Sequence, residues 1–167
     1  VEGSLTHLAG DRLDDGARLP QQRVARGLRD EVAPVVLLDP EVAGGAFELA
    51  LDRSSPWLKV VEVTANWRSH LWGKPYGDQG MFVRREVFRK IGGFPEWPLM
   101  EDVELAHRIR NAGQLSVIRQ PVVASSRRWM QGGILRTYLT MKLTQWGYYL
   151  GARPEGLARL YERGRRS

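Results

Sequence analysis

The chain has 167 residues, of which 43% are hydrophobic and 26% charged, a composition that is ordinary for a globular domain and does not favour disorder. It has no cysteine, which excludes disulfides, thiolate metal sites and thiol catalysis and fits a reducing compartment; its three histidines, His7, His70 and His107, are too widely spaced to favour a histidine metal site. The net charge of +6 is uneven, because residues 1–118 hold fifteen basic and seventeen acidic residues, whereas residues 119–167 hold ten basic and two acidic ones.

The first half of the chain alternates predicted helices with extended segments. Residues 1–12 show no period and are expected to form a loose segment, and a helix is predicted over residues 19–32. Residues 33–52 are expected to be extended, since their last part alternates apolar and polar residues. Pro56 then begins a predicted helix over residues 56–73, with proline in its first turn and glycine at its end.

The second half continues the same alternation and predicts one α/β domain over residues 1–167. A glycine-flanked loop leads to a short strand at residues 81–85 and a helix that ends at Gly92. The other predicted elements are a helix over Leu99–Asn111, a strand pair or a strand interrupted at Pro121 over residues 114–125, a long helix over residues 132–151, and a short helix over residues 154–164.

The last two helices are basic and amphipathic, and two interpretations of them stay open. The first of them has a wide apolar face made of Ile134, Leu135, Tyr138, Leu139, Met141, Leu143, Trp146, Tyr149 and Leu150. Such a face packs against the protein's own sheet, or it lies on an anionic membrane surface. The expected location is the cytoplasm, with contact to the inner face of the membrane as the alternative. A nucleic-acid partner is not expected, since no reading motif accompanies the charge.

Two adjacent carboxylates at the start of the helix over Leu99–Asn111 are the first candidates for chemistry. Val103, Ala106 and Ile109 fall at helical spacing and should face the core, which leaves Asp102 in the first turn, directed out of the helix end. A carboxylate in that position either stabilises the helix end or acts as a general base. Glu101 is rotated away and is expected to brace the neighbouring loop.

The segments "YGDQGMFVRREVFRKIGGF", "PLMEDVELAHRIRNAG" and "ASSRRW" follow one another in an order that resembles the C-terminal half of a family 2 glycosyltransferase of the GT-A type. The resemblance is nearest to a bacterial subgroup associated with radical-SAM proteins. It covers about Leu13 to Tyr161 and is densest over Tyr76–Trp129. It implies a partial GT-A-like mixed sheet flanked by helices, without the N-terminal strands that hold the nucleotide.

The resemblance also implies roles for particular residues. Asp102 would be the base that deprotonates a hydroxyl acceptor during inverting transfer from a nucleotide-diphospho-sugar, and the turn at residues 77–80 would line the donor pocket. Relatives carry Gln-x-x-Arg-Trp where this chain has serine before Arg128 and Trp129. The implied substrate-binding residues are Asp78, Gln79, Glu101, Arg127, Arg128 and Trp129.

The family's metal motif is an Asp-x-Asp pattern just before a "LP" helix start, and "LDDGARLP" occupies that place here. Asp14 and Asp15 are therefore implied ligands of Mg²⁺ or Mn²⁺, since hard cations prefer carboxylate oxygens. An Asp-Asp-Gly sequence is also a common turn, so the structural interpretation stays open. The alternative function is a non-catalytic glycosyltransferase remnant that binds a partner or an anionic membrane through its basic C-terminal third.

Overall fold

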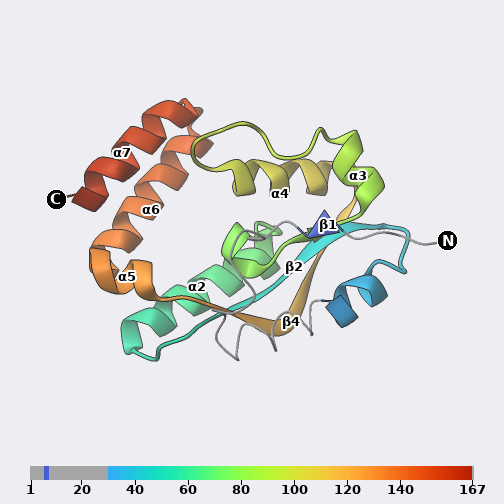
Figure 1. The fold of residues 1–167 in the computed structure, drawn as a ribbon, viewed down its shortest axis with the longest axis horizontal. Helices are drawn as coiled ribbons and strands as arrows, with labels where there is room; N and C mark the ends of the chain where they lie inside the picture. The colour runs from blue at the N-terminus through green and yellow to red at the C-terminus, as the bar shows by residue number, and fades with distance from the viewer. Residues whose placement is uncertain (1–5, 8–29, 167) are drawn as a thin grey trace, which may run out of the picture.

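A four-stranded mixed sheet lies at the centre of the structure, a computed structural model that describes residues 6–7 and 30–166 (Figure 1). The strands are β1 (Thr6–His7), β2 (Val42–Leu51), β3 (Phe82–Val83) and β4 (Gln114–Ala124), in the spatial order β1-β3-β2-β4. β3 pairs antiparallel with both β1 and β2, whereas β2 and β4 are parallel. The predicted α/β class is confirmed in this coarse form.

Helices cover both faces of this sheet. They are α2 (Pro56–Trp72), the 3₁₀ helix η1 (Gly77–Gln79), α3 (Arg85–Lys90), α4 (Glu101–Ala112), α5 (Arg127–Gly132), α6 (Ile134–Tyr149) and α7 (Pro154–Arg166), with a further helical segment at residues 30–36. On one face, Leu105, Ala106 and Ile109 of α4 pack against β2 and β3. On the other face, Ala33 packs against Phe47. α5, α6 and α7 follow one edge of the molecule (Figure 1).

Three sequence predictions of secondary structure need correction. Residues 33–36, expected to be extended, are helical, because Ala33 and Val36 turn to the same apolar cluster; β2 begins only at Val42. The segment at 1–12, expected to be loose, contributes β1, whose residues pair with β3. The chain after Ser126, not predicted as helical, forms α5. Residues 8–29, which hold most of the helix predicted over 19–32, lie outside the described residues.

The open question at residues 114–125 is resolved in favour of one interrupted strand. Phe47 of β2 is paired with Ile118 of β4, but the next residue, Glu48, is paired with Pro121, so two residues of β4 bulge out between them. Proline has no backbone N–H to donate, and a bulge on an edge strand is a position where that loss is tolerated. The strand therefore continues through Pro121.

Close contact within the sheet requires glycine at the point where β2 meets both neighbours. A Cβ atom on Gly45 would lie 2.3 Å from the Ser116 carbonyl oxygen and 2.5 Å from the Phe82 ring. Carbon atoms do not approach other atoms so closely without a backbone shift. The sequence "GG" in β2 is thus a packing requirement of the sheet and not a turn.

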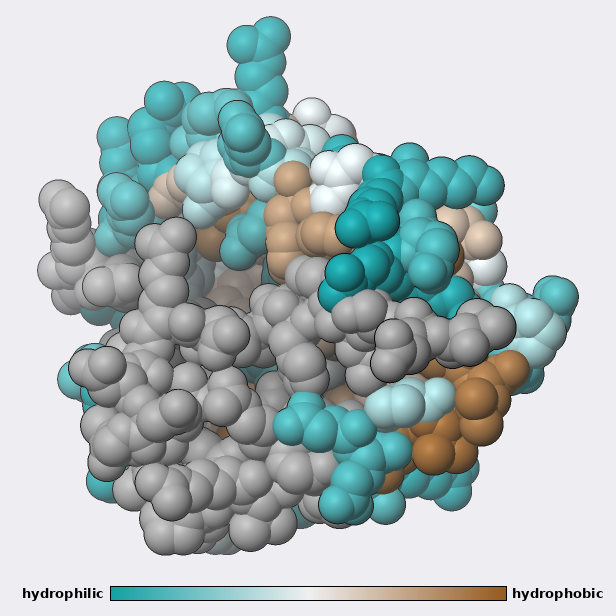
Figure 2. Space-filling model, turned by 45° about the vertical axis from the view of Figure 1, so that its right-hand side comes forward, coloured by the Kyte–Doolittle hydropathy of each residue, from teal (hydrophilic) through white to brown (hydrophobic). Residues whose placement is uncertain are grey.

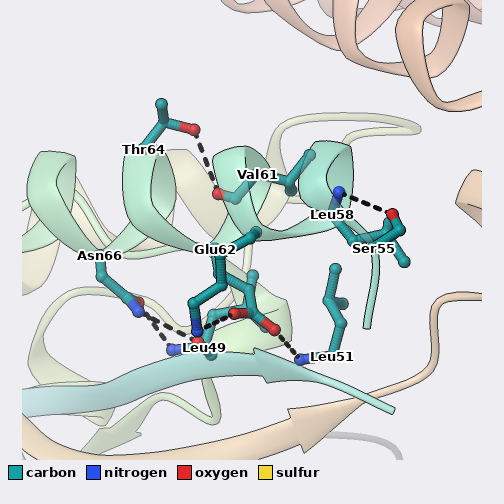
Figure 3. Close-up of polar contacts among 9 residues, drawn as sticks. Leu49, Leu51, Ser55, Leu58, Val61, Glu62, Thr64 and Asn66 are labelled. Carbon is teal, nitrogen blue, oxygen red and sulfur yellow. Dashed lines mark hydrogen bonds and ion pairs between the residues drawn. The ribbon is translucent and has the colours of Figure 1, made fainter. Parts of the chain in front are cut away.

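Polar side chains of α2 complete the edge of β2 that β3 leaves unpaired (Figure 3). Asn66 accepts a hydrogen bond from the Leu49 N–H at 2.7 Å and donates one to the Leu49 carbonyl at 3.0 Å. Glu62 accepts from the Leu51 N–H at 2.7 Å. These bonds replace the strand ladder, since a half-buried backbone group without a partner is costly. The N-terminus of α2 is capped by Ser55, whose hydroxyl oxygen accepts a hydrogen bond from the Leu58 N–H.

The described surface is mainly hydrophilic on the side that Figure 2 brings forward, with apolar areas of limited extent. Many of the large apolar side chains that are exposed belong to α2 and α6. Among the described helices, none combines the length and apolar character needed to cross a bilayer.

The Asn66 amide gives a direct test of the β2 edge. Asn66→Leu keeps the size of the side chain but leaves the Leu49 N–H and carbonyl unpaired, so the free energy of unfolding should fall by about 2–3 kcal/mol, measured by urea denaturation. Thr64→Val is the control, because the Thr64 hydroxyl bonds only to carbonyls of its own helix; it should change stability by less than about 0.5 kcal/mol. Equal losses in the two variants would contradict the role given to Asn66.

Candidate active site

Asp102 lies in the first turn of α4, where the sequence placed it. Its Oδ2 atom accepts a hydrogen bond from the Gly77 N–H at 2.7 Å, and its Oδ1 atom accepts one from the Val103 N–H at 2.8 Å. Gly77 is the first residue of η1, so the carboxylate joins α4 to the turn predicted to line the donor pocket. The two segments are far apart in the sequence, and the structure brings them into direct contact.

Glycine at position 77 favours this close contact. A Cβ atom there would lie 3.2 Å from Asp102 Oδ2, closer than side chains usually pack. A larger residue would therefore displace the carboxylate by a few tenths of an ångström. The carboxylate is half-buried, and its position is set by backbone donors of two elements.

Gln79 is fully buried, and its amide organises the turn from within. Its Oε1 atom accepts hydrogen bonds from the Ser69 hydroxyl at 2.8 Å, the Tyr76 N–H at 3.1 Å and the Arg68 guanidinium at 3.3 Å. Its Nε2 atom donates to the Phe47 carbonyl at 3.2 Å. These bonds position the turn, and the contact of Gln79 with a substrate stays a prediction.

Tyr76 is a candidate that sequence reasoning did not name. The Arg68 guanidinium lies 3.6 Å from the centre of its ring, which is buried. Burial raises the pKa of the Tyr76 hydroxyl far above its ordinary value. The positive charge of Arg68 partly offsets this rise, whereas Tyr149 and Asp102 add to it. Among the side chains of the described residues, this hydroxyl is the buried polar group without a hydrogen-bond partner.

A small cavity of about 30 Å³ joins η1 to α5 and α6. Asp78 and Trp129, both predicted to bind substrate, line it together, with Arg68, Tyr76 and Lys142 among the other lining residues. Burial, and to a smaller extent the charge of Arg68, lowers the pKa of Lys142. The structure therefore gathers cationic and aromatic groups beside the exposed residue Asp78.

Trp129 does not offer an open ring face for a sugar. It is 7% exposed, packs with Leu58 and Val61 of α2 and also lines the small cavity, so its contact with a sugar stays a prediction. Arg127 is exposed at the first residue of α5, and Glu101 is half-buried at the first residue of α4. Arg128 lies in α5, and its side chain is outside the described part.

The serine preceding α5 has a structural partner. Asp52, just after β2, accepts hydrogen bonds from the Ser126 hydroxyl at 2.5 Å and from the Ser126 N–H at 2.8 Å. These bonds tie the start of α5 to the end of β2, and they lower the pKa of the Asp52 carboxyl. Nothing in the sequence pairs these two positions, which are 74 residues apart.

A larger cavity of about 560 Å³ lies between the ends of α2, α4 and α6, and Asp102 does not line it. Its polar groups include Lys74, His107 and Arg110, and its walls include Tyr148 and Tyr149. The cations already have partners, since Lys74 lies over the Tyr149 ring and Arg110 donates to the Trp72 carbonyl. Arg110 therefore caps the C-terminal end of α2, and Lys74 packs against the C-terminal end of α6.

Glu104 closes one side of α4 against α6. It accepts hydrogen bonds from the Tyr148 hydroxyl at 2.6 Å and from the Arg108 guanidinium at 2.9 Å. Burial raises the pKa of this carboxyl, but the donated hydrogen bonds and the charge of Arg108 outweigh it, so the pKa lies below its ordinary value. α6 is thus fixed to the helix that carries Asp102.

The predicted metal ligands Asp14 and Asp15 lie outside the described residues. Within residues 6–7 and 30–166, no group of three or more His, Asp or Glu side chains is placed to hold a metal ion. No protein-family model matches the chain, and no curated protein matches its sequence.

The link between Asp52 and Ser126 predicts a pH dependence of stability. Because the folded-state pKa of Asp52 is lowered, its stabilising contribution is complete above the unfolded-state value near 3.8 and is lost as the pH falls through the folded-state value. Acid titration of stability, followed by urea denaturation at each pH, should show a shallower loss below about pH 4 in Asp52→Asn than in the wild type. Ser126→Ala should also make the loss of stability at low pH shallower. An unchanged dependence of stability on pH in both variants would contradict the link.

Proposed function

We propose that this chain belongs to the acceptor side of an inverting glycosyltransferase, in which Asp102 is the general base for transfer of a sugar from a nucleotide-diphospho-sugar to a hydroxyl group. One observation carries the proposal: the Asp102 carboxylate is held by the Gly77 N–H, beside the exposed residue Asp78. The resemblance of the sequence implies that the turn at residues 77–80 lines the donor pocket and that Asp102 is the base, and two such groups must lie close together for transfer to occur. The partial GT-A-like fold is part of the same proposal.

The proposed reaction is a single displacement. The acceptor oxygen attacks the anomeric carbon from the side opposite the diphosphate, while its proton passes to the Asp102 carboxylate. The bond between the anomeric carbon and the diphosphate oxygen breaks, its electron pair leaves with the nucleoside diphosphate, and the configuration at the anomeric carbon inverts. Each oxygen of Asp102 accepts one backbone hydrogen bond and has a further lone pair for the proton.

Two features of the site favour such a step. The carboxylate is positioned by backbone groups, so it needs little reorganisation when a hydroxyl arrives. Cationic groups are available for the leaving diphosphate: Arg127 is exposed on α5, and Lys142 lines the neighbouring cavity. The resemblance adds Arg128 to this set. Asp14 and Asp15 would hold a Mg²⁺ or Mn²⁺ ion, which would supply further charge to the diphosphate.

Nucleotide binding is the first test. Calorimetric titration with UDP and with GDP, each with and without Mn²⁺, should show binding to one of them. Asp102→Asn should leave this binding unchanged, because the proposed role of Asp102 is toward the acceptor. If neither nucleotide binds, the enzyme proposal fails and the non-catalytic remnant takes its place.

The base is tested by release of nucleoside diphosphate from UDP-glucose and GDP-mannose in the presence of simple glycoside acceptors. Asp102→Asn should lower the rate at least about 100-fold, the usual contribution of a positioned base. Gly77→Ala should give a smaller loss, because its Cβ would press on Asp102 Oδ2. Glu96→Gln, in the exposed loop before α4, is the control and should retain the wild-type rate. Full activity of Asp102→Asn would overturn the assignment.

A further inference from the structure

α6 is apolar on two opposite sides, and only one of them is buried. Its inner side packs Ile134, Tyr138 and Met141 near Leu58 and Trp129. Its outer side, here called the outer α6 face, consists of Leu135 (63% exposed), Leu139 (52%), Leu143 (62%), Trp146 (68%) and Leu150 (81%). No described segment covers this outer side.

The outer α6 face is a continuous stripe. Its residues follow at spacings of four, four, three and four, which place them above one another on a helix over about 22 Å. A shallow groove lined by Leu135, Leu139 and Leu143 extends along its first half. An apolar strip of this length on a described surface marks a contact with something outside the described residues.

The charge around this face indicates what the contact is. Residues 127–166 contain nine basic residues and two acidic ones, and α6 itself contains no acidic residue. α7 lies against α6, with Leu157 at Gly147 and Gly164 at Thr140, and it carries the exposed residue Arg159. An apolar stripe beside a basic helix is the pattern that matches the interface of an anionic bilayer.

A second copy of the chain fits this face less well, because dimerisation through α6 would bring two strongly basic segments together. α2 provides a comparison within the same molecule. It also exposes an apolar stripe, which consists of Trp57, Val60, Val63, Trp67 and Leu71. Of its charged residues, Glu62 and Arg68 are buried and Lys59 is exposed, so a single exposed charge accompanies that stripe and charge gives no occupant for it.

We propose that the outer α6 face inserts its leucines and Trp146 into the boundary between headgroups and acyl chains of an anionic membrane, while Arg159 of α7 and Arg153 just before it contact the lipid phosphates. Tryptophan is favoured at that depth, since its ring is apolar and its N–H reaches water or a headgroup. The face is separate from Asp102, so the proposal does not depend on sugar transfer.

Co-sedimentation of the full chain with vesicles tests this surface. We expect binding to phosphatidylcholine vesicles that contain about 30% phosphatidylglycerol, weak binding to phosphatidylcholine alone, and a decrease as salt is raised. Leu139→Ser combined with Leu143→Ser should lower the partition coefficient at least about tenfold, because each leucine contributes apolar area to the contact. Arg153→Glu combined with Arg159→Glu should lower binding to the vesicles that contain phosphatidylglycerol and leave the weak binding to phosphatidylcholine unchanged.

Val63→Ser combined with Leu71→Ser on α2 is the matched control, and it should leave vesicle binding within about twofold of wild type. Circular dichroism of each variant verifies that the helices persist, as expected for substitutions at exposed positions. Failure to bind anionic vesicles would overturn the proposal, as would equal loss in the α2 and α6 variants. A dimer in sedimentation velocity that the α6 substitutions dissociate would assign the face to a second copy instead. None of these outcomes bears on nucleotide binding, which tests the sugar-transfer proposal separately.

Discussion

The buried amide of Gln79 is the constraint on which the arrangement around Asp102 depends. Three donors converge on its oxygen, and its nitrogen donates to the backbone of β2. The amide therefore joins α2, the turn before η1 and the central strand at one point with no exposure to solvent. Because a buried polar group must keep its partners, this network fixes the turn, and the turn in turn presents the Gly77 N–H to Asp102.

The edge of β2 that faces β3 and α2 explains how α2 is oriented. β3 pairs with only two residues of β2, and the remaining edge is completed by Gln79, Asn66 and Glu62. These directional bonds hold α2 with its polar residues toward the strand and Leu58 and Val61 toward α6. The opposite side of α2 is left exposed, although it is apolar. An edge that a longer strand would have covered is satisfied here by side chains.

α6 serves the candidate site and the proposed membrane surface from opposite sides. Lys142 and Gln145 line the cavity that also contains Asp78, whereas Leu139 and Leu143 belong to the outer face. Glu104 and Tyr148 fix α6 to the helix that carries Asp102. A membrane that contacts the outer α6 face would therefore lie on the far side of this helix from the small cavity.

The sequence by itself determined the α/β class, the start and end of α2, and the place of Asp102 in the first turn of α4, because caps, prolines and apolar periods are local signals. Local signals failed at residues 33–36, where apolar residues fit a strand and a buried helix equally well. Only the tertiary structure decided that Gln79 is buried, that Trp129 packs in the core, and that Asp52 binds Ser126. Those outcomes depend on contacts between segments that are far apart in the sequence, and the residues next to a position in the sequence do not specify such contacts.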